Sequence, residues 1–106
     1  MLKAVFYRHN GSPTGFSVSG HAGYGYEGTD IVCAAVSSAV MLVCNTVTDF
    51  FGVNADVSVE ENRITLRLKE RNEAAEKLLE SFYCHMEAVA GEYSKVKLET
   101  HETGGK

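Results

Sequence analysis

The sequence places one cysteine and one histidine where they could act as a nucleophile and its base. Cys33 closely follows Thr29 and Asp30, which are typical of a helix N-cap, so we expect its thiol in the first turn of a helix. Helix N–H groups and the positive end of the helix dipole favour a thiolate there. His21 lies twelve residues earlier, and the intervening glycines would let its imidazole fold back toward the sulfur. Such a pair is suited to acyl transfer, with the helix N–H groups holding the oxyanion.

Two further side chains could support this pair. Ser37 lies one helical turn beyond Cys33 on the same face, so its hydroxyl could hydrogen-bond near the sulfur or the substrate. Asp30 could cap the helix or orient the imidazole of His21. A competing interpretation stays open, in which Cys33 is a small core residue and His21 a loop histidine bonded to backbone.

The segment between the histidine and the cysteine is rich in glycine and allows three interpretations. It includes Gly20, Gly23, Gly25 and Gly28, four of the ten glycines in the chain. They could form a flexible loop that gates a substrate, or a turn that only changes the chain's direction. Residues 23–28 also match the GxGxxG pattern of nucleotide-binding loops. The preceding strand belongs to a predicted antiparallel hairpin, and no lysine follows the loop, so nucleotide binding is the weakest of the three.

The remaining cysteines, histidines and acidic pairs predict no second site. Cys44 and Cys84 lie in apolar helical patterns and are expected in the core. No two cysteines or histidines show the short spacing of a zinc site, so we expect no metal and no other cofactor. Glu60 and Glu61 fall in a predicted hairpin turn and are interpreted as a solvated surface.

Alternation and helical periodicity predict the elements that must position these residues. Strands are expected over 2–9, 14–20, 56–60, 63–69 and 94–100, helices over 31–51 and 72–90, and a frayed tail over 101–106. Asn72 is the expected cap of the second helix and Gly91 its expected stop. The apolar residues of this helix fall on one stripe: Ala75, Leu78, Leu79, Phe82, Met86 and Val89. Because each strand has one apolar face, the order ββαββαβ predicts an α+β two-layer sandwich. Its sheet would be mostly antiparallel, with two helices packed on one face.

Size and composition limit the class of protein. The 106 residues suit one domain, which we assign to residues 1–106. A net charge of −4 argues against a nucleic-acid partner, and three cysteines argue against a disulfide framework. The apolar run 31–44 is shorter than the roughly 20 residues of a membrane span, and the N-terminus lacks a signal peptide, so we expect a cytoplasmic protein without a membrane partner. The first helix is apolar on most sides, which predicts burial against a second helix or a second subunit.

Two motifs resemble those of a known family. The segments are Gly20-His21-Ala22-Gly23-Tyr24-Gly25 and Asp30-Ile31-Val32-Cys33-Ala34-Ala35-Val36-Ser37. At this spacing the chain resembles, over essentially its whole length, the ribosomal-processing cysteine proteases (the Prp type) of Firmicutes and related bacteria.

The resemblance implies a small homodimeric endopeptidase without a cofactor. Its substrate would be the N-terminal extension of protein twenty-seven of the large ribosomal subunit, cut after an aromatic residue. The family's catalytic histidine and nucleophile fall on His21 and Cys33, and Asp30 and Ser37 take supporting roles. The alternative is a dimeric, non-catalytic module that binds the ribosome or a nascent ribosomal protein.

Overall fold

The computed structural model describes residues 1–20 and 31–104. In chain order the described elements are β1 (Leu2–His9), β2 (Ser12–Gly20), α1 (Ile31–Asn45), the π-helical turn η1 (Thr46–Phe50), β3 (Ala55–Glu60), β4 (Arg63–Leu68), α2 (Glu73–Glu92) and β5 (Val96–Thr103).

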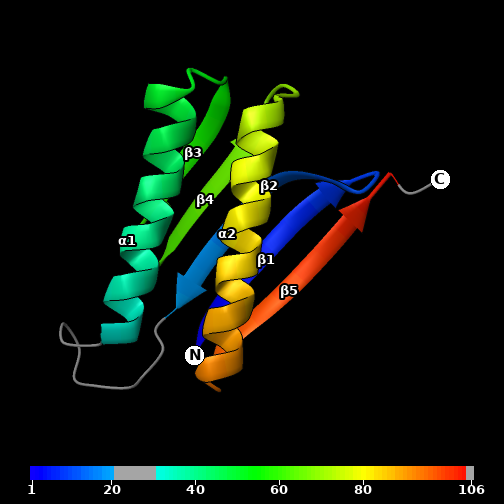
Figure 1. Cartoon of the computed structure of the whole chain (residues 1–106). Coiled ribbons are helices and arrows are strands. Elements are labelled where there is room, and N and C mark those ends of the chain that lie inside the picture. Colours follow the sequence, from blue (N-terminus) through cyan, green and yellow to red (C-terminus); the bar gives the residue numbers. More distant parts are fainter. Residues whose placement is uncertain (21–30, 105–106) are drawn as a thin grey trace.

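These strands form one sheet in the order β3-β4-β2-β1-β5. Every neighbouring pair is antiparallel except β1 and β5, which run parallel from Leu2↔Val96 to His9↔Thr103. Both helices lie on the same face of this sheet (Figure 1). The predicted fold class, a mostly antiparallel sheet with two helices on one face, is therefore confirmed.

The core lies between the sheet and an apolar stripe on each helix. On α2 the buried residues recur at helical spacing and include Ala75, Leu79, Phe82 and Met86, as the sequence pattern predicts. Asn72 caps this helix, since its side chain accepts a hydrogen bond from the Ala75 N–H at 2.9 Å. From the sheet, Phe6 and Phe16 meet Phe82, with ring centroids 5.0–5.9 Å apart. The other buried apolar residues complete this core: Leu2, Ala4, Val18, Val32, Val36, Val40, Val43, Cys44, Val47, Val53, Leu66 and Val96.

The first helix continues without a break through η1 to Phe50, one residue short of its predicted end. In the π-helical turn, the hydroxyls of Thr46 and Thr48 donate to the carbonyls of Leu42 and Cys44. The segment Ile31–Phe50 has a mean hydropathy of 2.0, so by length and composition alone it could span a membrane. Core helices that cover a sheet share these properties, and Figure 1 places α1 against the sheet.

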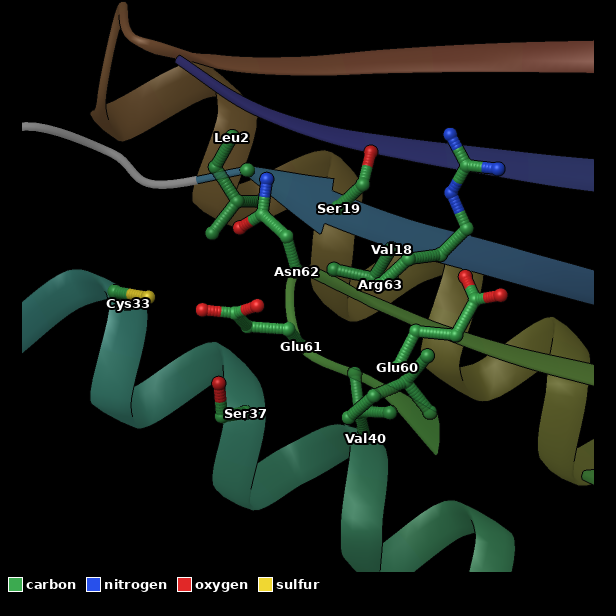
Figure 2. Close-up of a pocket in the computed structure, with 12 residues that line it drawn as sticks. Leu2, Val18, Ser19, Cys33, Ser37, Val40, Glu60, Glu61, Asn62 and Arg63 are labelled. Carbon is green, nitrogen blue, oxygen red and sulfur yellow. The ribbon is translucent and has the colours of Figure 1, made fainter. Parts of the chain in front are cut away.

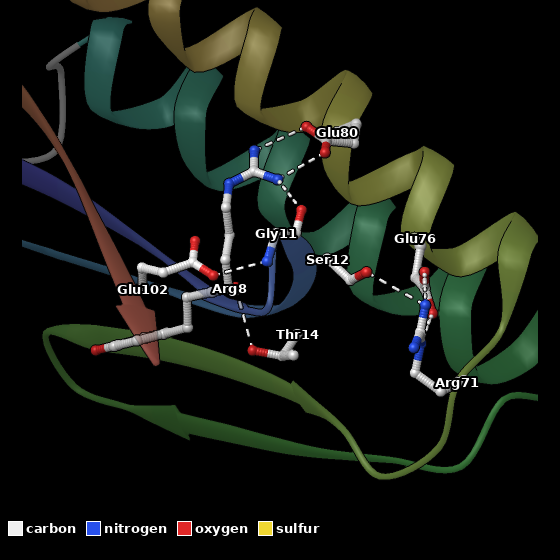
Figure 3. A network of polar contacts seen from close by, with 9 residues as sticks. Arg8, Gly11, Ser12, Thr14, Arg71, Glu76, Glu80 and Glu102 are labelled. Atoms are coloured by element: carbon white, nitrogen blue, oxygen red, sulfur yellow. Dashed lines mark hydrogen bonds and ion pairs between the residues drawn. The ribbon is translucent and has the colours of Figure 1, made fainter. Parts of the chain in front are cut away.

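A network of charged groups ties α2 to the end of the sheet where β1 meets β2 (Figure 3). The guanidinium of Arg8 donates to both carboxylate oxygens of Glu80 at 2.6 and 2.8 Å. These bonds raise the pKa of Arg8 and hold the pKa of the Glu80 carboxyl below its ordinary value of 4.5. Beside them, Arg71 pairs with Glu76 and donates to the Ser12 hydroxyl.

Three predictions about the second half of the chain were wrong. The expected tail 101–106 begins inside β5, because parallel pairing with β1 gives its backbone partners through Thr103 although its side chains are mostly polar. Helix α2 runs past Gly91 to Glu92, where the Tyr93 N–H still bonds the Val89 carbonyl. Cys84 is exposed, because it lies outside the buried stripe of α2.

The helix-covered face of the edge strand β3 is also less buried than the alternation of apolar and polar residues in its sequence predicts. Val57 and Val59 pair with Leu66 and Ile64, so they lie on the helix-covered side of the sheet. They nevertheless stay 39% and 63% exposed. The two layers therefore leave an apolar strip uncovered along β3.

Candidate active site

A pocket of about 110 Å³ lies at the end of the sheet where β1 begins and β2 ends (Figure 2). One wall is the first half of α1, and the opposite wall is the turn between β3 and β4. Its lining residues are Leu2, Val18, Ser19, Gly20, Cys33, Ser37, Val40, Glu60, Glu61, Asn62, Arg63 and Ile64.

The α1 wall carries the predicted nucleophile. Cys33 is the third residue of α1, and Ser37 and Val40 follow at spacings of four and three, which puts all three on one face. Cys33 is half-buried, while Ser37 is exposed. The structure thus brings Cys33 and Ser37 together in one pocket, as predicted, and the first helical turn has N–H groups without acceptors inside the helix. Cys33 also packs against the core. Its position therefore fits both interpretations, a nucleophile at the pocket and a small core residue.

Gly20 forms the pocket's edge directly before His21 in the sequence. Its φ of +89° lies in the left-handed region, which favours glycine. A Cβ at this position would overlap the carbonyl oxygen of Met1 at the start of β1. Its N–H donates to the carbonyl of Asn62 at 3.2 Å and so joins the end of β2 to the β3–β4 turn. A glycine is therefore required where the chain leaves the sheet at the pocket.

The other predicted site residues, His21, Asp30, Gly23, Gly25 and Gly28, lie outside the described residues. The contact between His21 and Cys33, and the capping or orienting role of Asp30, therefore stay predictions.

The wall formed by the β3–β4 turn was not predicted from the sequence. Glu60 and Glu61 were interpreted as a solvated surface, and both are exposed as predicted. Both also line the pocket, which was not predicted. In Figure 2 the Glu61 side chain extends across the pocket toward Cys33 and Ser37, whereas the side chains of Glu60 and Arg63 point away from them. Their residue types alone gave no signal of this, because the turn is brought here by the pairing of β4 with β2.

The other two thiols have different surroundings. Cys44 is 3% exposed in the core, and burial raises the pKa of its thiol to about 11. Its predicted core position is confirmed, and at neutral pH it is protonated. Cys84 lies on the exposed side of α2, and none of the three cysteines is in a disulfide. Among the described residues no three His, Cys, Asp or Glu side chains are grouped to hold a metal ion.

A thiol in the first turn of a helix, with a hydroxyl one turn further on and a pocket before it, is an arrangement that suits a small cysteine hydrolase of the α+β class. The family model for the cysteine protease Prp matches residues 1–97. The chain therefore belongs to the Prp cysteine protease family. No curated protein sequence matches it.

Solved structures share the fold. The ribosomal processing protease Prp from Staphylococcus aureus, in complex with a covalently linked product peptide, matches with a TM-score of 0.88 at 22% identity, over 95% of this chain and 100% of that one. The same protease with a substrate peptide matches with a TM-score of 0.80 at 20% identity, over 97% and 100%. SMU.848 from Streptococcus mutans matches with a TM-score of 0.79 at 27% identity, over 95% and 96%.

Proposed function

We propose that this cysteine protease is a cytoplasmic endopeptidase that removes the N-terminal extension of protein twenty-seven of the large ribosomal subunit, cutting after an aromatic residue. Family membership supports the reaction class. The main support for the active site is the position of Cys33, which lies in the first turn of α1 and lines the pocket. The similar Staphylococcus aureus protein is described as a ribosomal processing protease and binds substrate and product peptides.

In the proposed mechanism His21 removes the proton of Cys33, and the thiolate attacks the scissile carbonyl. N–H groups of the first turn of α1 stabilise the oxyanion. The intermediate collapses, His21 protonates the leaving amine, and a thioester joins the acyl group to Cys33. Water activated by His21 then hydrolyses this thioester and restores the thiol. Asp30 and Ser37 have supporting roles, and no metal or cofactor takes part.

The substrate is an extended, basic peptide rather than a nucleic acid. The net charge of −4 attracts a basic ribosomal-protein tail and repels phosphate. We assign the glycines of the segment that begins at Gly20 to a loop that admits the peptide and then closes over it.

We also propose that the enzyme is a homodimer that uses the outer face of α1. Leu42 is 69% exposed there, next to Met41 at 41%, and Phe50 at the end of η1 is 83% exposed. Burying such apolar side chains against a second copy would remove them from water. Sedimentation velocity should show a dimer that Leu42→Glu weakens and that Ala88→Glu, on an exposed position of α2, leaves intact. A wild-type monomer at all concentrations would refute the dimer.

The cleavage itself is tested with three single variants. Mass spectrometry of the extended ribosomal protein before and after incubation should show loss of the N-terminal extension with wild type, Cys44→Ala and Cys84→Ala. The Cys33→Ala variant should show no cleavage, with a circular dichroism spectrum like that of wild type. Cleavage at the wild-type rate by Cys33→Ala would refute the mechanism and leave the non-catalytic ribosome-binding module as the better account.

A further inference from the structure

We propose that the helix-free face of the sheet binds single-stranded RNA, with its phosphates on Arg63 and Arg67 and one base stacked on Tyr7. This inference goes beyond the proposed function, because Cys33 takes no part in it. Only the choice of RNA over DNA rests on that function, whose substrate is a protein of an RNA-containing particle.

The side chains concerned share one face of the sheet. Phe6, Phe16 and Leu66 pair across three strands and are buried beneath the helices. Side chains alternate along a strand, so the next row of residues points away from the helices. That row consists of Tyr7, Gly15 and Arg67. Both helices lie on the other side of the sheet (Figure 1), and a cavity of about 430 Å³ opens beside this row.

Gly15 forms the floor of this cavity. It pairs with Tyr7 in β1 and with Arg67 in β4, and it has no side chain to fill the space between them. A Cβ at this position would overlap the carbonyl oxygen of Leu66, so another residue would require the backbone to shift. A glycine within a strand also allows a ligand to approach the backbone closely. The gap between the ring of Tyr7 and the guanidinium of Arg67 can therefore hold a planar base.

Two arginines supply positive charge that the described part of the fold does not use. Arg63 and Arg67 are exposed, and both line the cavity. Among the described residues neither guanidinium makes a hydrogen bond or an ion pair, whereas Arg8 and Arg71 are both paired with glutamates. The two arginines lie four residues apart on β4, about 13 Å, since a strand rises about 3.3 Å per residue. They can therefore contact separate phosphates of one strand, each through the planar fork that suits phosphate oxygens.

The local charge of this face differs in sign from that of the whole chain. Asp56 lies 3.8 Å from the Lys69 ammonium, and Glu99 pairs with Lys3 at 3.0 Å, so these acidic groups have cationic neighbours. In the described part of the sheet the face holds five cations and three carboxylates: Lys3, Arg63, Arg67, Lys69 and Lys97 against Asp56, Glu60 and Glu99. Because salt screens charges beyond about 8 Å, this local excess can bind phosphate although the chain has a net charge of −4.

An aromatic ring and hydroxyl groups favour RNA over an acidic peptide as the partner. Tyr7 is 36% exposed and meets the ring of His101 at a right angle, with centroids 5.7 Å apart. Sheets that bind single-stranded RNA stack bases on such rings. Ser17 and Thr65, whose hydroxyls lie 3.4 Å apart, line the same cavity and can bond a 2′-hydroxyl. A glutamate-rich peptide would use the two arginines and leave the ring without a role.

Fluorescence anisotropy with a labelled oligomer of about twelve uridines tests the proposal. We expect a Kd of about 1–100 µM for wild type. Arg63→Gln and Arg67→Gln should each weaken binding about three- to tenfold, and each should reduce the slope of log affinity against log salt by about 0.7. Tyr7→Leu should weaken binding by roughly fivefold or more through lost stacking. Lys77→Gln removes one charge from the exposed side of α2 and, as the control, should change the Kd less than about twofold.

Crosslinking locates the bound strand independently of affinity. An oligomer that contains thiouridine forms adducts in light with the side chains it touches, and peptide mapping should place these adducts on β1, β2 and β4. Adducts confined to α1 and α2 would overturn the proposal, and so would a Kd that is unchanged in both arginine variants. Displacement of the RNA by a glutamate peptide at equal charge concentration would assign the face to acidic peptides instead. A deoxyuridine oligomer that binds as tightly would overturn the choice of RNA.

Peptide cleavage separates this proposal from the proposed function. Arg67→Gln lies outside the pocket of Cys33, so it should cleave a free peptide at the wild-type rate, with an unchanged circular dichroism spectrum. Loss of RNA binding with retained cleavage is the expected result for this variant. Absence of RNA binding by wild type would refute the docking surface and leave the protease assignment intact, whereas cleavage by Cys33→Ala would refute only the proposed function.

Discussion

Alanine substitution at Gly20 measures the steric constraint at the edge of the pocket, with Gly11 and Gly91 as control positions. Gly20 has a φ of +89°, and a Cβ there would overlap the Met1 carbonyl oxygen. Gly11, in the β1–β2 turn, has nearly the same φ of +84° and nothing within 4 Å of its hypothetical Cβ. Gly91 lies in α2, with open space around it and no positive φ. Alanine at these three positions therefore separates backbone strain from steric overlap.

The expected losses follow from these geometries. An alanine at positive φ costs roughly 1–2 kcal/mol, so Gly11→Ala should lower the free energy of unfolding by about that amount. Gly20→Ala adds the overlap with Met1, which forces β1 or β2 to shift and costs about 1–3 kcal/mol more. Gly91→Ala should raise the free energy of unfolding by about 0.5–1 kcal/mol, because glycine is a poor helix former.

Urea unfolding followed by circular dichroism gives all three values under the same conditions. Peptide cleavage then shows whether the strain matters for the site. In Gly20→Ala the strand end that leads to His21 must move, so kcat/KM should fall under conditions where the protein stays folded, whereas Gly11→Ala should retain activity. If Gly20→Ala and Gly11→Ala lose the same free energy of unfolding, the overlap with Met1 does not constrain the native state, and the reasoning is refuted.

Three further predictions concern groups outside the pocket. The Cys44 thiol, whose pKa burial raises to about 11, should resist maleimide at pH 7 and react fully in 8 M urea, and rapid labelling of the folded protein would contradict its position in the core. Glu80→Gln removes the carboxylate bound by Arg8 and should cost about 0.5–1 kcal/mol at pH 7, a small value because the Glu80 side chain is 46% exposed. Since folding lowers the pKa of Glu80, its contribution exists above pH 4.5 and disappears as the pH falls through the folded-state pKa, so urea unfolding should show the variant and wild type converging in acid. Asn72→Ala leaves the Ala75 N–H without its capping oxygen and should lower the free energy of unfolding by about 1 kcal/mol, whereas an unchanged urea midpoint would show that the cap contributes nothing.

The sequence predicted those features that depend on neighbours along the chain. Asn72 was identified as a cap because its side chain bonds an N–H three residues later, and the α2 stripe followed from helical spacing. The positions of Cys33 and Ser37 on one face of α1 needed only the start of the helix and its period. Alternation in each strand, combined with two amphipathic helices, was enough to predict the two layers.

Features that depend on pairing between distant strands could not be predicted in the same way. Glu61 faces Cys33 because β4 pairs with β2, which no local pattern specifies. The polar end of β5 was taken for a frayed tail, since its backbone partners in β1 lie more than ninety residues earlier. Cys84 was assigned to the core from its apolar neighbours in the sequence, although its position on α2 is exposed to solvent.

The parallel pair of β1 and β5 affects when the enzyme can first be complete during its own synthesis. Leu2 lines the pocket, and its N–H is held by the carbonyl of Lys95 immediately before β5. That side of the sheet therefore forms only after the last strand has left the ribosomal exit tunnel. Contacts of such long sequence separation also form slowly, because closing a long loop costs entropy. A nascent chain that already contains Cys33 would thus lack a finished pocket until β5 has been synthesised and has paired with β1.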